Sequence, residues 1–320
     1  MTAASLSSLS DSLFSITVAL YSLAVVAFCA QLAFGRRPAR TPEMVGAGAP
    51  AARPDETPAE DSRGRRWGLV AMGLTILGAL TQAGVLLFRG LATDRLPWGN
   101  MYEFGTATVL IAVVVYTIFA VRVPALRHLG LFVLAPVVVA LVLIGLFLYA
   151  DAGPLVAALR SYWLAIHVTT AIIGFGIFFV SGIASVLYLL RSRYEAKEAA
   201  GEAPAGSGFR VVERLPAAAS LDRVAHRTAV FGFPIWTFAV IAGAIWAEAA
   251  WGRFWGWDPK ETWAFIAWVV YAAYLHARTT AGWRGRPAAW VNVVGLVVMI
   301  FNLLFVNMVS TGLHSYAGVS

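Results

Sequence analysis

The sequence carries little charge for its length, and this shortage restricts the class of protein it can encode. Only 13% of its 320 residues are charged, whereas 59% are hydrophobic. A soluble domain carries about a quarter charged residues, so roughly half of the charge that a soluble surface needs is missing. The shortage excludes an ordinary cytoplasmic enzyme and indicates a protein whose solvent is largely lipid.

Cysteine is nearly absent as well. The single cysteine, Cys29, lies within an apolar run, so no disulfide can form inside the chain. The sequence contains neither a CxxC pair for thiol redox chemistry nor a CxxCH motif for attaching haem to this chain. An internal repeat and a glycine-rich phosphate loop are also missing. These absences exclude a thiol oxidoreductase and a cytochrome that carries haem covalently.

Long apolar runs are what the sequence has instead. About 18 to 25 apolar residues cross a bilayer as a helix, and eight runs fit a span of this kind, although the seventh is short. The predicted spans are 13–34, 67–88, 104–121, 129–149, 162–190, 228–246, 262–277 and 288–309. The first run has no basic region before it and is too long for a cleaved signal peptide. The expected fold class is an all-α polytopic membrane protein with about eight transmembrane helices, one domain over residues 1–320.

Lysine and arginine are concentrated on one side of the predicted spans. The loops 35–66, 122–128, 191–227 and 278–287 hold 19 of the 24 basic residues. Eight spans place these four loops on the same side, which the positive-inside rule makes cytoplasmic. Both termini are then expected to be external. Because membrane orientation explains the net charge of +7, we expect no nucleic-acid partner.

The two long cytoplasmic loops differ in composition. The loop 35–66 is rich in proline, alanine, glycine and charge, which predicts disorder. The loop 191–227 begins with the helix-like RSRYEAKEAA and continues through glycine- and proline-rich sequence. A short helix is expected near residues 221–227.

The external segment 247–261 is unusually rich in tryptophan. With its flanking residues it reads WAEAAWGRFWGWDPKETW, which contains five tryptophans and a phenylalanine. Tryptophan is enriched at membrane interfaces, so an aromatic belt accounts for one or two of them. The cluster of Trp251, Trp255 and Trp257 around two glycines exceeds what a belt needs. Glycine lets the backbone approach a ligand closely, and indole faces form a flat apolar platform, so the segment is a candidate site for a planar ligand.

The same segment contains a helix-start signal. Asp258, Pro259 and Glu261 occupy the N-cap, N1 and N3 positions of a capping box. We expect this structural role for both carboxylates rather than acid–base catalysis.

The sequence has five histidines: His128, His167, His226, His276 and His314. Their positions relative to the predicted spans distinguish candidate ligands from structural residues. His167, near the external end of the fifth span, and His314, beyond the eighth, can both reach the tryptophan-rich segment. One imidazole on each side could ligate an iron axially. His276 lies roughly 22 Å along the seventh span from its external end and is a candidate for a second, inner site. His128 and His226 lie in basic loops and are expected to be solvated structural residues.

These residues resemble a known family. WGRFWGWDPKETW is similar to the tryptophan-rich "WWD" signature of the haem-handling proteins of cytochrome c biogenesis. Three further segments resemble the CcsA/ResC branch, often called CcsB in actinobacteria. They are SYWLAIHV with His167, AYLHAR with His276 and GLHSYA with His314. LPWGNMYEF (96–104) is the best match in the N-terminal half. Length and span number also fit this branch better than the shorter CcmC or the much longer CcmF.

The resemblance implies roles for individual residues. His167 and His314 match the external histidines that bind the iron of haem b. His276 matches the histidine of an inner haem site, whose other axial ligand comes from a ResB-type membrane subunit. Arg253 fills a variable position of the signature and is either a partner for a haem propionate or an exposed interfacial arginine. The cofactor-binding set that the resemblance implies is His167, His314, His276, Trp251, Trp255, Trp257 and Asp258.

The reaction implied by the resemblance joins haem vinyl groups to the thiols of a CxxCH motif on apocytochrome c. It would take place outside the bacterial plasma membrane, in a system II cytochrome c synthase (haem lyase) complex. The chain would supply position rather than a catalytic side chain. Its implied partners are the ResB-type subunit, apocytochrome c, an external thiol-reducing protein and the lipid bilayer.

Two alternatives remain at this level. The chain could be a haem transporter or chaperone that does not catalyse attachment. It could also be a haem b electron-transfer subunit of a respiratory complex. The second alternative is disfavoured because such subunits pair histidines at matched depths, whereas His167 and His276 lie at opposite depths.

Overall fold

The computed structural model describes residues 1–34, 62–154, 160–202, 211–308 and 312–314, and every regular element in these ranges is helical. This confirms the all-α class. A short 3-10 helix, η1 (Pro124–Leu129), lies between the third and fourth α-helices. The α-helices are α1 (Ala3–Phe34), α2 (Ser62–Thr93), α3 (Met101–Arg122), α4 (Gly130–Phe147), α5 (Tyr162–Ala199), α7 (Ala218–Trp251), α8 (Pro259–Thr279) and α9 (Arg286–Met308).

Seven of the described helical segments are long and apolar enough to cross a membrane. The remaining long helix, α8, corresponds to the seventh predicted span and has 21 residues. Its tryptophans, its tyrosines and His276 lower its hydropathy. It packs along α9 and against α7 as part of the bundle. The chain is therefore a polytopic membrane protein of roughly eight helices.

The helices extend beyond the apolar runs that predict them. α5 continues through the helix-like residues after position 190 as far as Ala199. α7 begins at Ala218, so the short helix expected near residues 221–227 is the start of α7 and not a separate element. α2 begins at Ser62, so the last residues of the expected disordered loop 35–66 are helical. Residues 35–61 and 203–210 lie outside the described residues.

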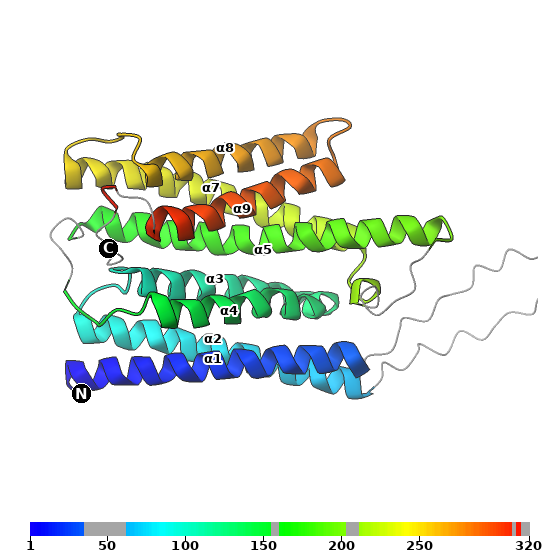
Figure 1. Cartoon of the computed structure of the whole chain (residues 1–320), viewed down its shortest axis with the longest axis horizontal. Helices are drawn as coiled ribbons and strands as arrows, with labels where there is room; N and C mark the ends of the chain where they lie inside the picture. Colours follow the sequence, from blue (N-terminus) through cyan, green and yellow to red (C-terminus); the bar gives the residue numbers. More distant parts are fainter. Residues whose placement is uncertain (35–61, 155–159, 203–210, 309–311, 315–320) are drawn as a thin grey trace, which may run out of the picture.

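The bundle has two halves, α1–α4 and α7–α9, with α5 between them (Figure 1). α1 packs along α2 and α5 along α7, and α5 contacts both α3 and α9. The second half has an aromatic core, in which Phe178 of α5 stacks on Tyr271 of α8 with ring centroids 3.5 Å apart. The edge of Phe178 also meets Trp236 of α7 at 6.4 Å. A single side chain thus joins three helices.

The two ends of the bundle differ in charge, as the loop pattern predicts. The α3–η1–α4 connection, the α8–α9 turn and the ends of α5 and α1 lie at one end of Figure 1. Met1, the α2–α3 loop and the α7–α8 loop lie at the other end. We call this second end the histidine end, for the residues described below. That it faces the outside remains a prediction from the positive-inside rule.

Candidate functional site

His167 of α5 and His314, which follows α9, line the same two adjoining cavities at the histidine end. The first cavity is closed mainly by α7, α8 and the tryptophan-rich segment, and its lining includes Trp251 and Trp255. The second is closed by the α2–α3 loop, including Trp98. The cavities measure about 100 and 80 Å³. The structure therefore brings together the two histidines that the sequence places at one end of the spans.

Each of these histidines is held by its Nδ1 atom. His167 Nδ1 lies 2.8 Å from the carbonyl oxygen of Ala239 on α7. His314 Nδ1 lies 2.8 Å from Oδ1 of Asp258. Because a carbonyl or carboxylate oxygen only accepts, Nδ1–H donates in both cases, and the lone pair of each neutral ring is then on Nε2. This is the tautomer that histidine ligands of metals usually have.

A glycine permits the close contact between α7 and His167. A Cβ atom on Gly243 would lie 2.7 Å from Cε1 and 2.8 Å from Nδ1 of His167, which is closer than real Cβ atoms approach. α7 can therefore present the Ala239 carbonyl to the ring only if residue 243 has no side chain.

Tryptophan rings fix the orientation of both imidazoles. Trp246 is buried and stacks nearly parallel to His167, with centroids 5.9 Å apart. The edge of Trp246 also meets His314 at 5.8 Å, and Trp251 meets His314 at 5.0 Å. Trp246 was expected only as a flank of the segment. Its position one helical turn beyond Gly243 on α7 is the signal that could have identified it.

The tryptophans of the segment do not all face the cavities. Trp251 and Trp255 line the first cavity. Trp257 is 66% exposed, and its ring packs on Trp255 at 5.8 Å and on Phe265 at 6.3 Å. Its φ of 57° lies in the left-handed region, which is unfavourable for a residue with a side chain. Trp257 thus presents an aromatic surface outside the cavities.

The capping box predicted at the start of α8 is present. Asp258 Oδ1 accepts from the backbone N–H of Lys260 at 3.1 Å, and Glu261 Oε2 accepts from the N–H of Asp258 at 3.1 Å. Asp258 has a second role that the sequence did not indicate, because it also accepts from His314 Nδ1 and, at 2.8 Å, from the N–H of Leu313. Burial alone would raise the pKa of Asp258, but these hydrogen bonds hold that pKa at about 2.

Arg253 is paired within the segment. Its guanidinium lies 3.2 Å from Oε1 of Glu261, whose Oε2 also accepts from the N–H of Gly256 at 2.9 Å. The structure therefore gives Arg253 a carboxylate of this chain as its partner, and Arg253 is absent from the lining of both cavities.

A family model described as Cytochrome C assembly protein matches residues 98–314, a range that contains both cavities and both histidines. A cytochrome c biogenesis protein CcsA from Gloeobacter violaceus is 33% identical over 296 residues, which cover 78% of this chain and 86% of the relative. The chain belongs to the cytochrome c assembly protein family.

Other CcsA relatives support the same membership. The CcsA protein of Synechococcus elongatus is 35% identical over 290 residues, 78% of this chain and 88% of the relative. The CcsA protein of Parasynechococcus marenigrum is 44% identical over 179 residues. In that match the chain spans 59% of the relative's length, and 52% of this chain is covered. The resemblance to the CcsA branch is thus confirmed.

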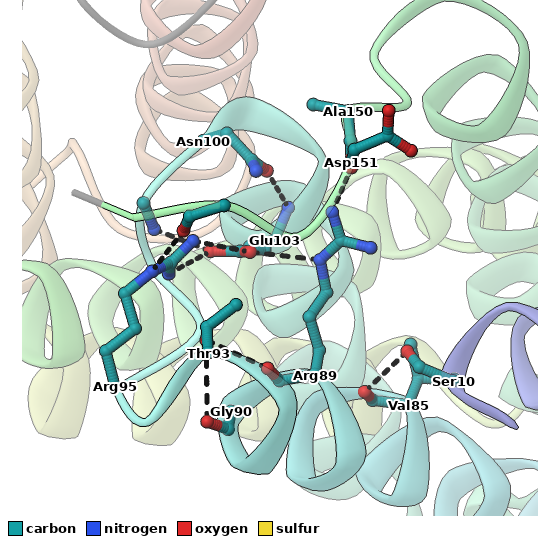
Figure 2. Close-up of polar contacts among 12 residues, drawn as sticks. Ser10, Val85, Arg89, Gly90, Thr93, Arg95, Asn100, Glu103, Ala150 and Asp151 are labelled. Atoms are coloured by element: carbon teal, nitrogen blue, oxygen red, sulfur yellow. Dashed lines mark hydrogen bonds and ion pairs between the residues drawn. The ribbon is translucent and has the colours of Figure 1, made fainter. Parts of the chain in front are cut away.

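A buried ion-pair network supports the α2–α3 side of the candidate site (Figure 2). Glu103 of α3 lies 3.0 Å from Nε of Arg89 and 2.7 Å from Nη1 of Arg95. The side chains of Arg89 and Glu103 have no exposed surface. Arg89 also donates to the carbonyl oxygen of Ala150 and lies over the ring of Tyr102 at 4.7 Å. The network therefore links α2, α3 and the residues after α4.

This network fixes the short loop between α2 and α3. Glu103 Oε2 accepts from the N–H of Gly99 at 2.7 Å, and Asn100 caps α3 by accepting from the N–H of Glu103 at 2.9 Å. Trp98 and Asn100, held in this way, line the second cavity. Arg89 and Arg95 are two of the five basic residues outside the four predicted cytoplasmic loops, and the loop pattern does not predict their pairing with Glu103. An acidic residue directly before an apolar run, as Glu103 is, was the available signal.

The remaining histidines lie away from the cavities. His276 is exposed on the surface of α8, in its last turn. His226 lies within α7, half-buried, with its ring 6.5 Å from that of Tyr274. The expectation of a solvated loop residue is wrong for His226, because α7 begins earlier than its apolar run. His128 lies in η1 and is half-buried.

Proposed function

We propose that this protein holds haem b between His167 and His314 and presents it to apocytochrome c outside the plasma membrane, as a subunit of a system II cytochrome c synthase. The observation that supports this most strongly is the pair of imidazoles lining the same cavities, each with Nδ1 held by an acceptor of this chain. Two such rings offer the two axial nitrogen ligands of a haem iron. The apolar, tryptophan-lined walls suit the macrocycle.

The two ligands are expected to differ in strength. His314 donates to an ionised carboxylate, whereas His167 donates to a neutral carbonyl. A carboxylate acceptor raises the basicity of a ligating imidazole more than a carbonyl does. Neither cavity alone is large enough for a macrocycle, so we expect the side chains between them to shift when haem enters.

Attachment requires addition of a thiol across each vinyl group. The sulfur bonds to one vinyl carbon and the thiol hydrogen goes to the other, so no external oxidant is needed. Both thiols come from apocytochrome c, because the only cysteine of this chain lies in α1. The contribution of this chain is to hold haem and peptide in a defined geometry. Phe254 and Trp257, which are 60% and 66% exposed beside the first cavity, offer an aromatic surface for the peptide.

The remaining partners fit the same proposal. The exposed position of His276 on α8 suits a haem ligand shared with a second membrane subunit of the ResB type. Such a shared site would supply haem from the inner side. A separate thiol-reducing protein would keep the CxxCH thiols of apocytochrome c reduced.

Production of a c-type cytochrome by cells that carry this protein, its partner subunit and an apocytochrome reporter tests the proposal. We expect His167→Ala and His314→Ala to reduce thioether-bound haem in the reporter at least tenfold, and added imidazole to restore part of it. His128→Ala is the matched control and should leave the yield unchanged. Unreduced yield in both variants would contradict the proposal. If the purified complex holds haem at His167 and His314 but forms no thioether with an apocytochrome peptide, the protein is a haem transporter.

A further inference from the structure

Lys260 places a positive charge beside both histidines. This residue, in the first turn of α8, lines both cavities together with His167 and His314. Its ammonium group donates to Oδ1 of Asn307 on α9. Within the described residues no carboxylate oxygen lies within 4.0 Å of the Lys260 ammonium.

The neighbouring carboxylates are already occupied. Asp258 accepts from His314 and from two backbone N–H groups, and Glu261 accepts from Arg253 and from two more. An ammonium in a cavity with mainly apolar walls is unfavourable unless a counter-charge reaches it. The charge of Asp258 acts on Lys260 only from beyond 4.0 Å, so a ligand with a negative charge in the cavity would stabilise the ammonium further.

Trp98 supplies a second donor on the same cavity. Its Nε1 is buried and has no hydrogen-bond acceptor among the described residues. Trp98 lines the second cavity opposite α8, on the loop that Glu103 fixes. The indole N–H can only donate, and a buried donor without an acceptor costs free energy. Because the Nε1 atom itself is buried, a ligand in the second cavity could supply the missing acceptor only after the side chains around the indole shift.

Lys260 and Trp98, two residues that line one cavity and carry only hydrogen-bond donors on their side chains, together favour a group that only accepts hydrogen bonds and carries negative charge. An ionised carboxylate has these properties, with two oxygens and about four lone pairs. The same cavity contains His167 and His314. A carboxylate bound there would belong to a molecule whose body the two imidazoles hold.

We propose that Lys260 and Trp98 form a carboxylate subsite that binds one propionate of the haem. This inference rests on the proposed function, since it concerns the same site. It transfers to Lys260 the role that the sequence suggested for Arg253, because Arg253 is paired with Glu261 and lies outside the cavity lining. The Arg89–Glu103–Arg95 network then acts as the support that positions Trp98.

The test compares haem with haem dimethyl ester, in which both propionates are blocked, on the purified full-length protein with its partner subunit. Dissociation constants come from optical titration of the wild type, Lys260→Gln, Lys260→Arg and Trp98→Phe. Hydrogen bonds to charged groups contribute enough to change affinity roughly 10- to 100-fold. We expect the wild type to prefer haem over the ester by that factor, Lys260→Gln to lose most of the preference, and Lys260→Arg to keep it. Trp98→Phe, which retains the ring and removes the donor, should lose a smaller part.

The spectra separate failure of the subsite from failure of the proposed function. If the wild-type spectrum shows two imidazole ligands that His167→Ala and His314→Ala change, haem occupies the proposed site. In that case an equal preference for haem over the ester in the wild type and Lys260→Gln overturns the carboxylate subsite. If the spectrum does not change in the two histidine variants, the proposed function itself is wrong.

Discussion

Two groups of charged and polar side chains lie at the histidine end, and they are completed in opposite ways. In the network of Arg89, Arg95 and Glu103, the chain supplies both charges of each pair. In the neighbouring cavities, the ammonium of Lys260 has no carboxylate within 4.0 Å among the described residues, and each histidine is held through its Nδ1 atom. The first group pairs its charges within the chain and holds the backbone of the α2–α3 loop. We propose that a ligand completes the second group.

This contrast gives different expectations for substitutions in the two groups. Substitutions in the network of Arg89, Arg95 and Glu103 should chiefly affect folding. Changes around the cavities should chiefly affect ligand binding.

Glu103→Gln should cause the largest loss of stability. It leaves the mostly buried Arg95 without its carboxylate partner and the buried Arg89 with only the partly exposed Asp11, 3.7 Å away. Breaking a buried ion pair in this way costs about 3–5 kcal/mol. Thermal unfolding of the detergent-solubilised protein and its abundance in the membrane measure the effect. Glu248→Gln, at an exposed position of α7, is the control. A variant as stable as this control would show that the network does not support the fold.

Gly243→Ala should destabilise the protein by about 1–3 kcal/mol, the usual cost of overpacking. The added Cβ would collide with His167 and displace its ring. Because the displaced imidazole could no longer ligate iron in the same geometry, haem affinity should also fall. Gly73→Ala is the matched control, because nothing lies within 4 Å of a Cβ at that helical position. Alanine there should be neutral or slightly stabilising. Equal behaviour of the two variants, in unfolding and in haem titration, would refute the close contact.

Asp258 combines the two kinds of role, and two substitutions can separate them. Asp258→Ala loses the helix cap, which costs about 1 kcal/mol, and loses the acceptor for His314. Asp258→Asn keeps a good N-cap but removes the charge beside His314, so stability should be nearly normal while haem affinity falls roughly 10- to 100-fold. Unfolding and haem titration of both variants make the comparison. Normal haem affinity in Asp258→Asn would limit Asp258 to capping.

The same residue predicts a dependence of stability on acid. The pKa of Asp258 falls from 3.8 to about 2 on folding, so its carboxylate form is favoured in the folded state. The stability that it contributes is present above pH 4 and is lost as the pH falls from about 4 to 2. Unfolding curves of the wild type and Asp258→Asn across this window should converge at the acidic end. Parallel curves would contradict the depressed pKa.

His276→Ala should have the smallest effect on stability, within about 0.5 kcal/mol, because the side chain is exposed. If haem moves outward from an inner site shared with the partner subunit, this variant should nevertheless lower the haem content at His167 and His314. The effect should be seen only when the partner is present. Haem stoichiometry and spectra with and without the partner measure it. Normal occupancy in the complex would exclude the relay through His276.

The sequence predicted the number and centres of the helices well, but not their ends. Apolar runs located the eight long helices of the described residues, because a bilayer is crossed by apolar helices. The polar continuation of α5 depends on contacts outside the run, such as the hydrogen bonds from Arg191 to the carbonyls of Val212 and Glu213. A hydropathy pattern contains no information about such contacts. The capping box at Asp258 was predictable because it depends only on neighbouring residues.

The site could be predicted only in part for a similar reason. The depths of His167 and His314 follow from counting residues along their spans, and the structure places both at the cavities. The direction of Trp257 depends on a left-handed backbone angle that its sequence does not require. The position of Lys260 depends on the rotation of α8 about its axis, and that of Trp98 on ion pairs between α2 and α3. Pairings between separate helices of this kind are not encoded in local spacing.

The most direct test of the site is the ligation of haem iron by the two histidines together. Purified protein loaded with haem should give a low-spin, six-coordinate spectrum with two imidazole ligands, by magnetic circular dichroism or electron paramagnetic resonance. His167→Ala and His314→Ala should each lose one of these ligands and regain the wild-type spectrum when imidazole is added. An unchanged low-spin spectrum in the double variant would show that neither histidine binds the iron.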